Sequence, residues 1–329
     1  MYPKNKKMVS IILILGIMNI FFACDATHQP KGNINDSGAP GVRIPNDLGY
    51  NNLSVILTLI DAPKGWAIAR SGGPIVAIID SGVISNHPDL PVLLPGYSAV
   101  STLSPNEDKR NHGTGVAGTV GALGNNGIGG VGINWNAKIL PVKADASSGT
   151  FSAANINKCI RWAVDNGAKI INLSLGTSGN DFTIKAAIDY AYNKGAAIFA
   201  ASGNESRNSI NFPAGYSNVM AVGATFNGTS RADTSNYGPG LDVVAIVPYY
   251  TTTAEGEYAS RLGTSFASPQ VAGLASLIWA INPNLTNEQV YKIIRDGAKP
   301  LGGGYNEETG YGLINIYNSL LLAKATLWQ

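Results

Sequence analysis

Histidine, the side chain best suited to acid-base chemistry at neutral pH, occurs only three times in the 329 residues. His28 lies in a polar stretch near the amino terminus, and His87 lies in a His-Pro-Asp turn. His112 lies in the glycine-rich segment NHGTGVAG. An imidazole accepts and returns a proton near pH 7, so His112 is the candidate general base. Taken alone, it also fits a structural histidine.

Two further segments supply a carboxylate and a hydroxyl. The apolar run PIVAII is typical of a buried parallel strand, and Asp80 follows it directly, ahead of a turn glycine. The segment that begins Gly-Thr-Ser continues as an apolar helix, which places Ser265 near a helix amino terminus. Each segment alone also fits an ordinary turn or cap. Together they supply an orienting carboxylate, a base and a nucleophile in the chain order Asp, His, Ser.

These motifs resemble those of the subtilisin-like serine proteases. Asp-Ser-Gly, His-Gly-Thr and Gly-Thr-Ser-x-Ala-Ser-Pro occur in the family's order and spacing, and the resemblance runs from about Leu57 to Ala325. It implies a serine endopeptidase whose chemistry requires no cofactor. In that family's mechanism Ser265 would attack the peptide carbonyl, His112 would carry the proton, and Asp80 would orient the imidazole.

The resemblance also assigns residues around the reacting carbonyl. Asn204 follows the apolar segment AAIF and matches the asparagine that stabilises the oxyanion. On its residue types alone, the Gly-Asn pair at this position equally fits a turn. Ser174, Leu175 and Gly176 match the segment that pairs with an extended peptide substrate through main-chain hydrogen bonds.

The expected specificity pocket is a slot lined by small side chains. Ala201, Ser202 and Gly203 face the substrate segment and leave room for the substrate residue that precedes the cleaved bond. Asn211 is expected near the pocket base, where a polar group disfavours large aromatic side chains. The expected partners are therefore proteins or peptides that bind as substrates.

Three functional classes fit this set of residues. The first is a general endopeptidase, and the second is a protease dedicated to maturing one partner. The third is an inactive subtilisin-like binding module, and the intact set of Asp80, His112, Ser265 and Asn204 argues against it. The sequence favours an enzyme but does not distinguish the first class from the second.

Composition is that of a globular protein with a large core. Apolar residues make up 45% of the chain and charged residues 13%, and the net charge is +2. The only basic run is the one at residues 4–7, and basic and aromatic side chains do not alternate. The sequence therefore predicts no nucleic-acid partner, and we expect a monomer.

The alternation of apolar runs and amphipathic segments predicts an α/β fold with three layers, in which a central, mostly parallel sheet carries helices on both faces. The expected strands are 75–79, 139–143, 169–173, 196–200, 219–223 and 241–245, and the expected helices are 152–166, 181–194, 265–281 and 287–296. Such sheets bind ligands beyond the carboxyl ends of their strands, where Asp80, Ser174 and Asn204 fall.

The amino terminus has the pattern of a signal peptide over residues 1–24. Lys4, Lys6 and Lys7 precede an apolar stretch, and the ending FFAC resembles a bacterial lipobox in which Cys24 receives the lipid. This pattern predicts an exported protein that a lipid anchors to the membrane of the cell envelope; plain secretion and an uncleaved anchor are the alternatives. Residues 25–56 are expected to be a flexible tether or a short pro-segment, followed by the peptidase domain at 57–325.

Two further expectations concern stability. Cys159 has core spacing on an expected helix, which indicates a buried apolar side chain, and it has no partner for a disulfide within the mature domain. Asp89 and Asn125 match positions that bind calcium in many subtilisins. The segment around Asn125 equally fits an ordinary Asn-Gly turn, so a structural calcium ion and a simple turn are both open.

Overall fold

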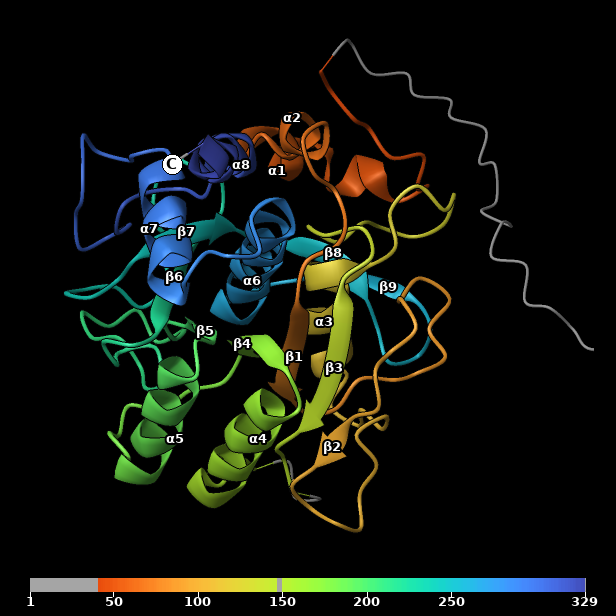
Figure 1. Ribbon diagram of the computed structural model, residues 1–329, viewed down its shortest axis with the longest axis vertical. Helices are drawn as coiled ribbons and strands as arrows, with labels where there is room; N and C mark the ends of the chain where they lie inside the picture. The colour runs from red at the N-terminus through yellow and green to blue at the C-terminus, as the bar shows by residue number, and fades with distance from the viewer. Residues whose placement is uncertain (1–40, 147–149, 329) are drawn as a thin grey trace, which may run out of the picture. The chain divides into compact units, whose positions relative to one another are not determined.

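A seven-stranded parallel sheet forms the centre of the computed structural model, which describes residues 41–146 and 150–328 (Figure 1). The strands are β1 (Ile75–Asp80), β2 (Tyr97–Ser98), β3 (Lys138–Lys143), β4 (Ala168–Leu173), β5 (Ala197–Ala201), β6 (Met220–Thr225) and β7 (Val243–Ile246). Their order is β2-β3-β1-β4-β5-β6-β7, and every pairing is parallel. The direction of strand addition reverses at β1, so its carboxyl end lies at the switch point where such sheets bind ligands.

Helices cover both faces of the sheet. On one face α4 (Ala153–Asp165) packs beside α5 (Phe182–Asn193), and on the other α3 (Gly113–Gly121) packs beside α6 (Thr264–Ile281). The remaining helices are α1 (Ser54–Leu59), α2 (Ala62–Trp66), α7 (Asn287–Gly297), α8 (Ile316–Ala325) and the short 3-10 helices η1 (Tyr50–Asn52) and η2 (Thr326–Trp328). This arrangement confirms the predicted three-layer α/β fold.

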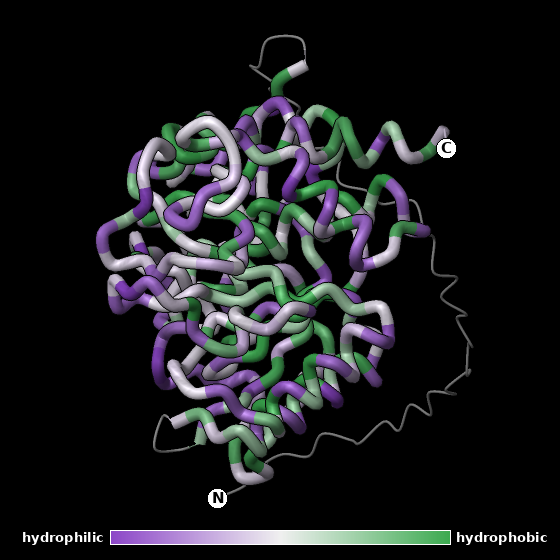
Figure 2. The backbone as a smooth tube through the Cα atoms, turned by 90° about the vertical axis from the view of Figure 1, so that its left-hand side faces the viewer, coloured by the Kyte–Doolittle hydropathy of each residue, from purple (hydrophilic) through white to green (hydrophobic). Residues whose placement is uncertain are grey.

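Local sequence explains most of these elements. The strands are buried along nearly their whole length, as expected for a sheet covered on both faces, and apolar segments accordingly fill the interior (Figure 2). Ser152 caps α4, Asp181 caps α5, and Thr286 forms a capping box with Gln289 at the start of α7. The expected boundaries of these helices are therefore accurate to within one residue at each end.

Two elements near the expected site have no counterpart in the sequence-based assignment. The hairpin of β8 (Tyr249–Thr252) and β9 (Tyr258–Arg261) is antiparallel and packs against α3. Every residue of α3 is buried although the helix contains four glycines. A Cβ added at Gly118 would lie 2.2 Å from Thr252 Oγ1, so glycine permits this close approach. The same glycines lower intrinsic helix propensity, which hides the helix from sequence analysis.

The folded unit begins earlier than the boundary at residue 57 that the sequence suggested. The main chain of Arg43 donates a hydrogen bond to Pro63, Gly49 donates one to Gly129, and Leu53 is fully buried. Residues 41–56 therefore pack with the described fold and are not a flexible tether, whereas the alternative of a short pro-segment stays a prediction. The expected signal peptide and residues 25–40 lie outside the described residues. Within residues 41–146 and 150–328, no helix has the length and apolarity needed to cross a bilayer.

Candidate active site

The carboxylate of Asp80 and the ring of His112 meet at the carboxyl end of β1. Asp80 is the last residue of that strand, and His112 immediately precedes α3. Nδ1 of His112 lies 2.8 Å from Oδ1 of Asp80, whose side chain is fully buried, whereas the imidazole is 29% exposed. The histidine is thus held on one side by a buried carboxylate and remains open to solvent on the other.

Ser265 lies in the first turn of α6. Gly263 precedes the helix with φ +103°, a conformation that favours glycine. The ring of Phe266, the residue after the serine, packs edge-on against His112 at a centroid distance of 5.3 Å, so the first turn of α6 contacts the histidine. Ser265 Oγ donates a hydrogen bond to the carbonyl oxygen of Ser174 at 3.3 Å.

A proline within α6 explains how the serine is tied to the expected substrate segment. Pro269 has no N–H, so the helix leaves the carbonyl oxygen of Ser265 without its usual donor four residues later. Ser174 Oγ donates to that oxygen at 2.7 Å. Asn172 completes the network, because it donates to Ser174 Oγ and accepts from Ser268 Oγ. Sequence analysis missed Asn172, whose only signal is a buried amide within an apolar strand.

Asn204 lies beside the start of α6. Its carbonyl oxygen accepts hydrogen bonds from the main-chain N–H of Thr264 at 2.9 Å and from Thr264 Oγ1 at 3.1 Å. This fixes the orientation of the side-chain amide and leaves its N–H groups as donors. An amide donor held at the start of the helix that carries Ser265 has the chemistry needed to stabilise an oxyanion.

The small residues expected to line a pocket, Ala201, Ser202 and Gly203, lie at the end of β5 and directly after it. Asn211 donates its main-chain N–H to Ser202 O, and its amide lies 3.0 Å from a carboxylate oxygen of Glu205. A Cβ added at Gly203 would lie 2.6 Å from the Asn211 amide nitrogen, so only glycine fits there. Asn236, which sequence analysis did not single out, also donates to Glu205, at 2.7 Å.

The expected substrate segment lies at the end of β4, next to a cavity. Within the described ranges no strand pairs with residues 174–176, and the chain then forms a bridge between Thr177 and Phe212. A cavity of about 350 Å³ opens beside Leu175 and Gly176 and is lined mainly by apolar side chains from α4, α5 and the segment around Phe212. An extended peptide along this segment would place side chains into the cavity.

The charges around His112 favour its protonated form. Burial lowers the pKa of His112, but the charge and hydrogen bond of Asp80 outweigh that effect, and Asp108 adds to them. The positive charge of Arg110 acts in the opposite direction and lowers the pKa of His112. The pKa of His112 therefore lies above its ordinary value, which suits a base that must hold a proton during the reaction.

The two residues expected to bind calcium lie in a cluster with a third, Asp47. Asp47 accepts hydrogen bonds from the main-chain N–H groups of Asn125 and Asn126, and Asp89 accepts one from the Asn126 amide. Burial raises the pKa of both carboxyl groups, that of Asp89 to about 7. The other oxygen of Asp89, Oδ2, is buried without a hydrogen-bond partner. Asp47 was missed because its position in the presumed tether gave no signal.

Comparisons with known proteins identify the family. Residues 71–312 match the Subtilase family model, Peptidase S8. The chain belongs to the subtilase family. Subtilisin DY from Bacillus licheniformis is 42% identical to this subtilase over 267 residues, which cover 79% of this chain and 96% of the relative. Subtilisin Savinase from Lederbergia lenta is 40% identical over 261 residues, which cover 79% of this chain and 95% of the relative.

A third relative and a solved structure extend the comparison. Alkaline elastase YaB from Bacillus sp. (strain YaB) is 40% identical to this subtilase over 268 residues, covering 76% of this chain and 68% of the relative. The solved structure of a protease from Pseudoalteromonas arctica superposes with a TM-score of 0.75 at 28% identity, covering 85% of this chain and 99% of the other. The subtilase is thus a subtilisin-like serine endopeptidase, which excludes the inactive binding module.

Proposed function

We propose that this subtilase cleaves internal peptide bonds through an acyl-enzyme formed on Ser265, with His112 as general base and Asp80 as its orienting partner. The observation that carries the proposal is the 2.8 Å contact between the buried Asp80 carboxylate and His112, whose ring also packs against Phe266, the residue after Ser265. His112 accepts the serine proton as the Oγ–carbonyl bond forms. It then returns the proton to the leaving amine, and water hydrolyses the ester.

Asn204 is proposed as the side-chain donor for the oxyanion that forms in both steps. Its orientation is already fixed by Thr264, so no reorganisation is needed when charge develops. In subtilisin, loss of the equivalent amide lowers turnover about 10²- to 10³-fold. Asn204 thus contributes to the transition state rather than to ground-state binding.

The proposed substrate is an extended peptide that pairs with Ser174, Leu175 and Gly176. The cavity beside this segment suits an apolar substrate side chain. The slot of Ala201, Ser202 and Gly203 suits a small side chain next to the cleaved bond. A relative named as an elastase supports this preference. A peptide-library profile separates the two enzyme classes, because broad cleavage favours a general endopeptidase and a single narrow motif favours a dedicated maturation protease.

The direct test of the active site is covalent labelling of the purified protein with a serine-directed phosphonate. We expect one adduct per chain, mapped by mass spectrometry to Ser265, together with parallel loss of casein hydrolysis. The adduct forms only if the serine is activated by a neighbouring base, so it reports the mechanism as well as the residue. An unlabelled wild-type protein would rule out the proposed active site.

We propose further that Asp47, Asp89 and Asn125 hold a structural calcium ion, although the chemistry of catalysis requires no cofactor. Two buried carboxylates lie close enough for the charge of Asp47 to raise the pKa of Asp89, and Asp89 Oδ2 lacks a hydrogen-bond partner. A divalent cation with oxygen ligands would relieve both unfavourable features. Among the described residues no group of three or more His, Cys, Asp or Glu side chains is assembled, so amide and main-chain oxygens would complete the shell.

Removing calcium with a chelator is expected to lower the melting temperature by at least about 5 °C at pH 8. Because the pKa of Asp89 is raised to about 7, the cation-free folded chain retains a proton that the unfolded chain loses near pH 4. Without the cation, stability should therefore fall as pH rises from about 4 to 7. Added calcium should abolish that fall. Calorimetry of Asp89→Asn is the control, since its stability should not respond to chelator and should fall less than that of the cation-free wild type as pH rises through this window.

Export and anchoring form a separate proposal. We propose that the protein is exported as a monomer and retained at the cell envelope by a lipid on Cys24; this residue lies outside the described structure. Palmitate labelling in a bacterial host should mark the wild-type chain and place it in the membrane fraction, whereas Cys24→Ala should be unlabelled and soluble. Cys159→Ala is the matched control, because this cysteine is buried and should not affect labelling. Labelling that persists in Cys24→Ala would contradict the lipid anchor.

A further inference from the structure

A second buried carboxylate, that of Asp108, lies next to the catalytic histidine. Asp108 is 6% exposed, and Oδ2 accepts the main-chain N–H of Thr114 at 2.8 Å. Oδ1 accepts a longer hydrogen bond, of 3.4 Å, from the main-chain N–H of His112. The residue preceding α3 makes no side-chain capping bond, so Asp108 satisfies the free N–H groups from outside the helix.

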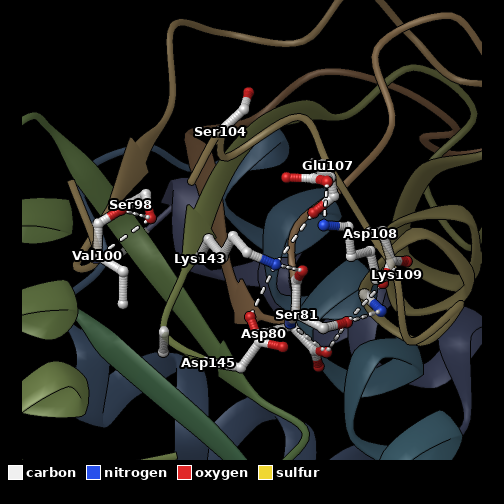
Figure 3. A network of polar contacts seen from close by, with 12 residues as sticks. Asp80, Ser81, Ser98, Val100, Ser104, Glu107, Asp108, Lys109, Lys143 and Asp145 are labelled. Carbon is white, nitrogen blue, oxygen red and sulfur yellow. Dashed lines mark hydrogen bonds and ion pairs between the residues drawn. The ribbon is translucent and has the colours of Figure 1, made fainter. Parts of the chain in front are cut away.

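Ser81 joins this carboxylate to Asp80, as Figure 3 shows. Its Oγ lies 2.7 Å from Asp108 Oδ1 and 3.1 Å from Asp80 Oδ1, and it accepts the main-chain N–H of Gly113 at 3.1 Å. The hydroxyl has one proton, and the shorter distance assigns it to Asp108. The link to Asp80 is made by the main-chain N–H of Ser81, which donates to Asp80 Oδ1 at 2.7 Å. The serine thus links the two carboxylates to the first turn of α3.

Lys143 holds the main chain next to both carboxylates, Asp80 and Asp108. It is the last residue of β3, is 3% exposed, and forms an ion pair with Asp145 at 2.8 Å. Its ammonium group donates to the carbonyl oxygen of Ser81 and, at 3.1 Å, to that of Glu107, as drawn in Figure 3. One buried cation therefore holds the residue after Asp80 and the residue before Asp108.

We propose that Asp108 is a positioning residue for the reaction, a second carboxylate that fixes His112 and the amino terminus of α3 relative to Asp80. The proposal rests on the roles given above to Asp80 and His112. Asp108 contacts the histidine backbone and acts on the ring through position and charge. Ser81 and Lys143 hold the Asp108 carboxylate in this position.

The charge of Asp108 gives the proposal a signature in the pH profile. The charged groups that act on the imidazole are Asp80 and Asp108, which favour the protonated ring, and Arg110, which disfavours it. Replacing Asp108 with asparagine keeps an acceptor for the Thr114 N–H but removes one negative charge. The imidazolium is then less stabilised, so the pKa of His112 must fall.

The test measures kcat and KM from pH 5 to 10 for the wild type, Asp108→Asn and Asp108→Ala in the full chain. For Asp108→Asn we expect kcat to fall about tenfold, KM to change little, and the acidic limb of the profile to move down by about half a pH unit. Asp108→Ala also loses the cap and should lower kcat about a hundredfold. If the alanine variant does not fold, the kcat and pH profile of the asparagine variant still test the positioning role.

Asp242→Asn is the matched control. Asp242 is 7% exposed, accepts the main-chain N–H of Ala221 at 2.8 Å, and pairs with Arg295 at the start of β7, so the variant should lose stability. It should not move the kinetic pKa. An active wild type whose pH profile and kcat are unchanged in Asp108→Asn overturns the positioning role. A wild type that neither reacts with phosphonate nor cleaves casein refutes the proposed function instead.

Discussion

Replacing Ser265 with alanine is expected to lower kcat about 10⁶-fold, the loss seen when subtilisin loses its serine or its histidine. The substitution removes the only atom proposed to bond to the substrate carbonyl, so His112 and Asp80 have no nucleophile to activate. The fold should persist, because the tie to Ser174 runs through the Ser265 carbonyl oxygen, which remains. Steady-state hydrolysis of a chromogenic peptide measures the loss, and KM should change little.

A second serine on the same helix provides the control. Ser276 lies further along α6, where its Oγ donates to Gly273 O at 2.6 Å and accepts from the Asn134 amide at 2.7 Å. Ser276→Ala should cost stability but retain turnover and phosphonate labelling. Residual activity above about 1% in Ser265→Ala would require another nucleophile, and the proposed acyl-enzyme would have to be abandoned.

The parts of this subtilase that sequence reasoning predicted are those that local residues determine. The apolar run before Asp80 is buried on both faces, which defines β1 and places the carboxylate at its end. Asp181 and Thr286 mark helix starts because the capping bond lies within three residues of the cap. Three polar residues at the ends of different strands then converge because parallel strands share one carboxyl edge.

The parts that were missed depend on contacts between distant residues. The glycines of α3 oppose a helix locally, and only the close approach of Thr252 explains them. Asp47 lies in a segment that looks like a linker until its carboxylate meets the main chain of Asn125. Lys143 looks like the end of an amphipathic strand, and its bond to Ser81 O spans 62 positions. A single sequence does not specify which of many polar side chains will pair across such separations.

Replacing Asp80 with asparagine is expected to lower kcat about 10⁴-fold, the cost of the same change in another serine protease triad. If the amide oxygen faces His112, it keeps the hydrogen bond but supplies no negative charge to stabilise the imidazolium. If the amide nitrogen faces the ring, it donates to Nδ1 and forces the tautomer in which Nε2 carries the proton and cannot accept another. The first orientation weakens the base and the second disables it, and neither touches Ser265.

The pH profile distinguishes this loss from simple misfolding. Asp80 contributes more than Asp108 to raising the pKa of His112, so the acidic limb should move further in Asp80→Asn than in Asp108→Asn. Thermal melts of both variants provide the control for stability. A kcat loss smaller than tenfold in Asp80→Asn would contradict its orienting role. Equal pKa shifts in the two variants would contradict this order. They would mean that Asp80, although hydrogen-bonded to Nδ1, stabilises the imidazolium no more than Asp108 does.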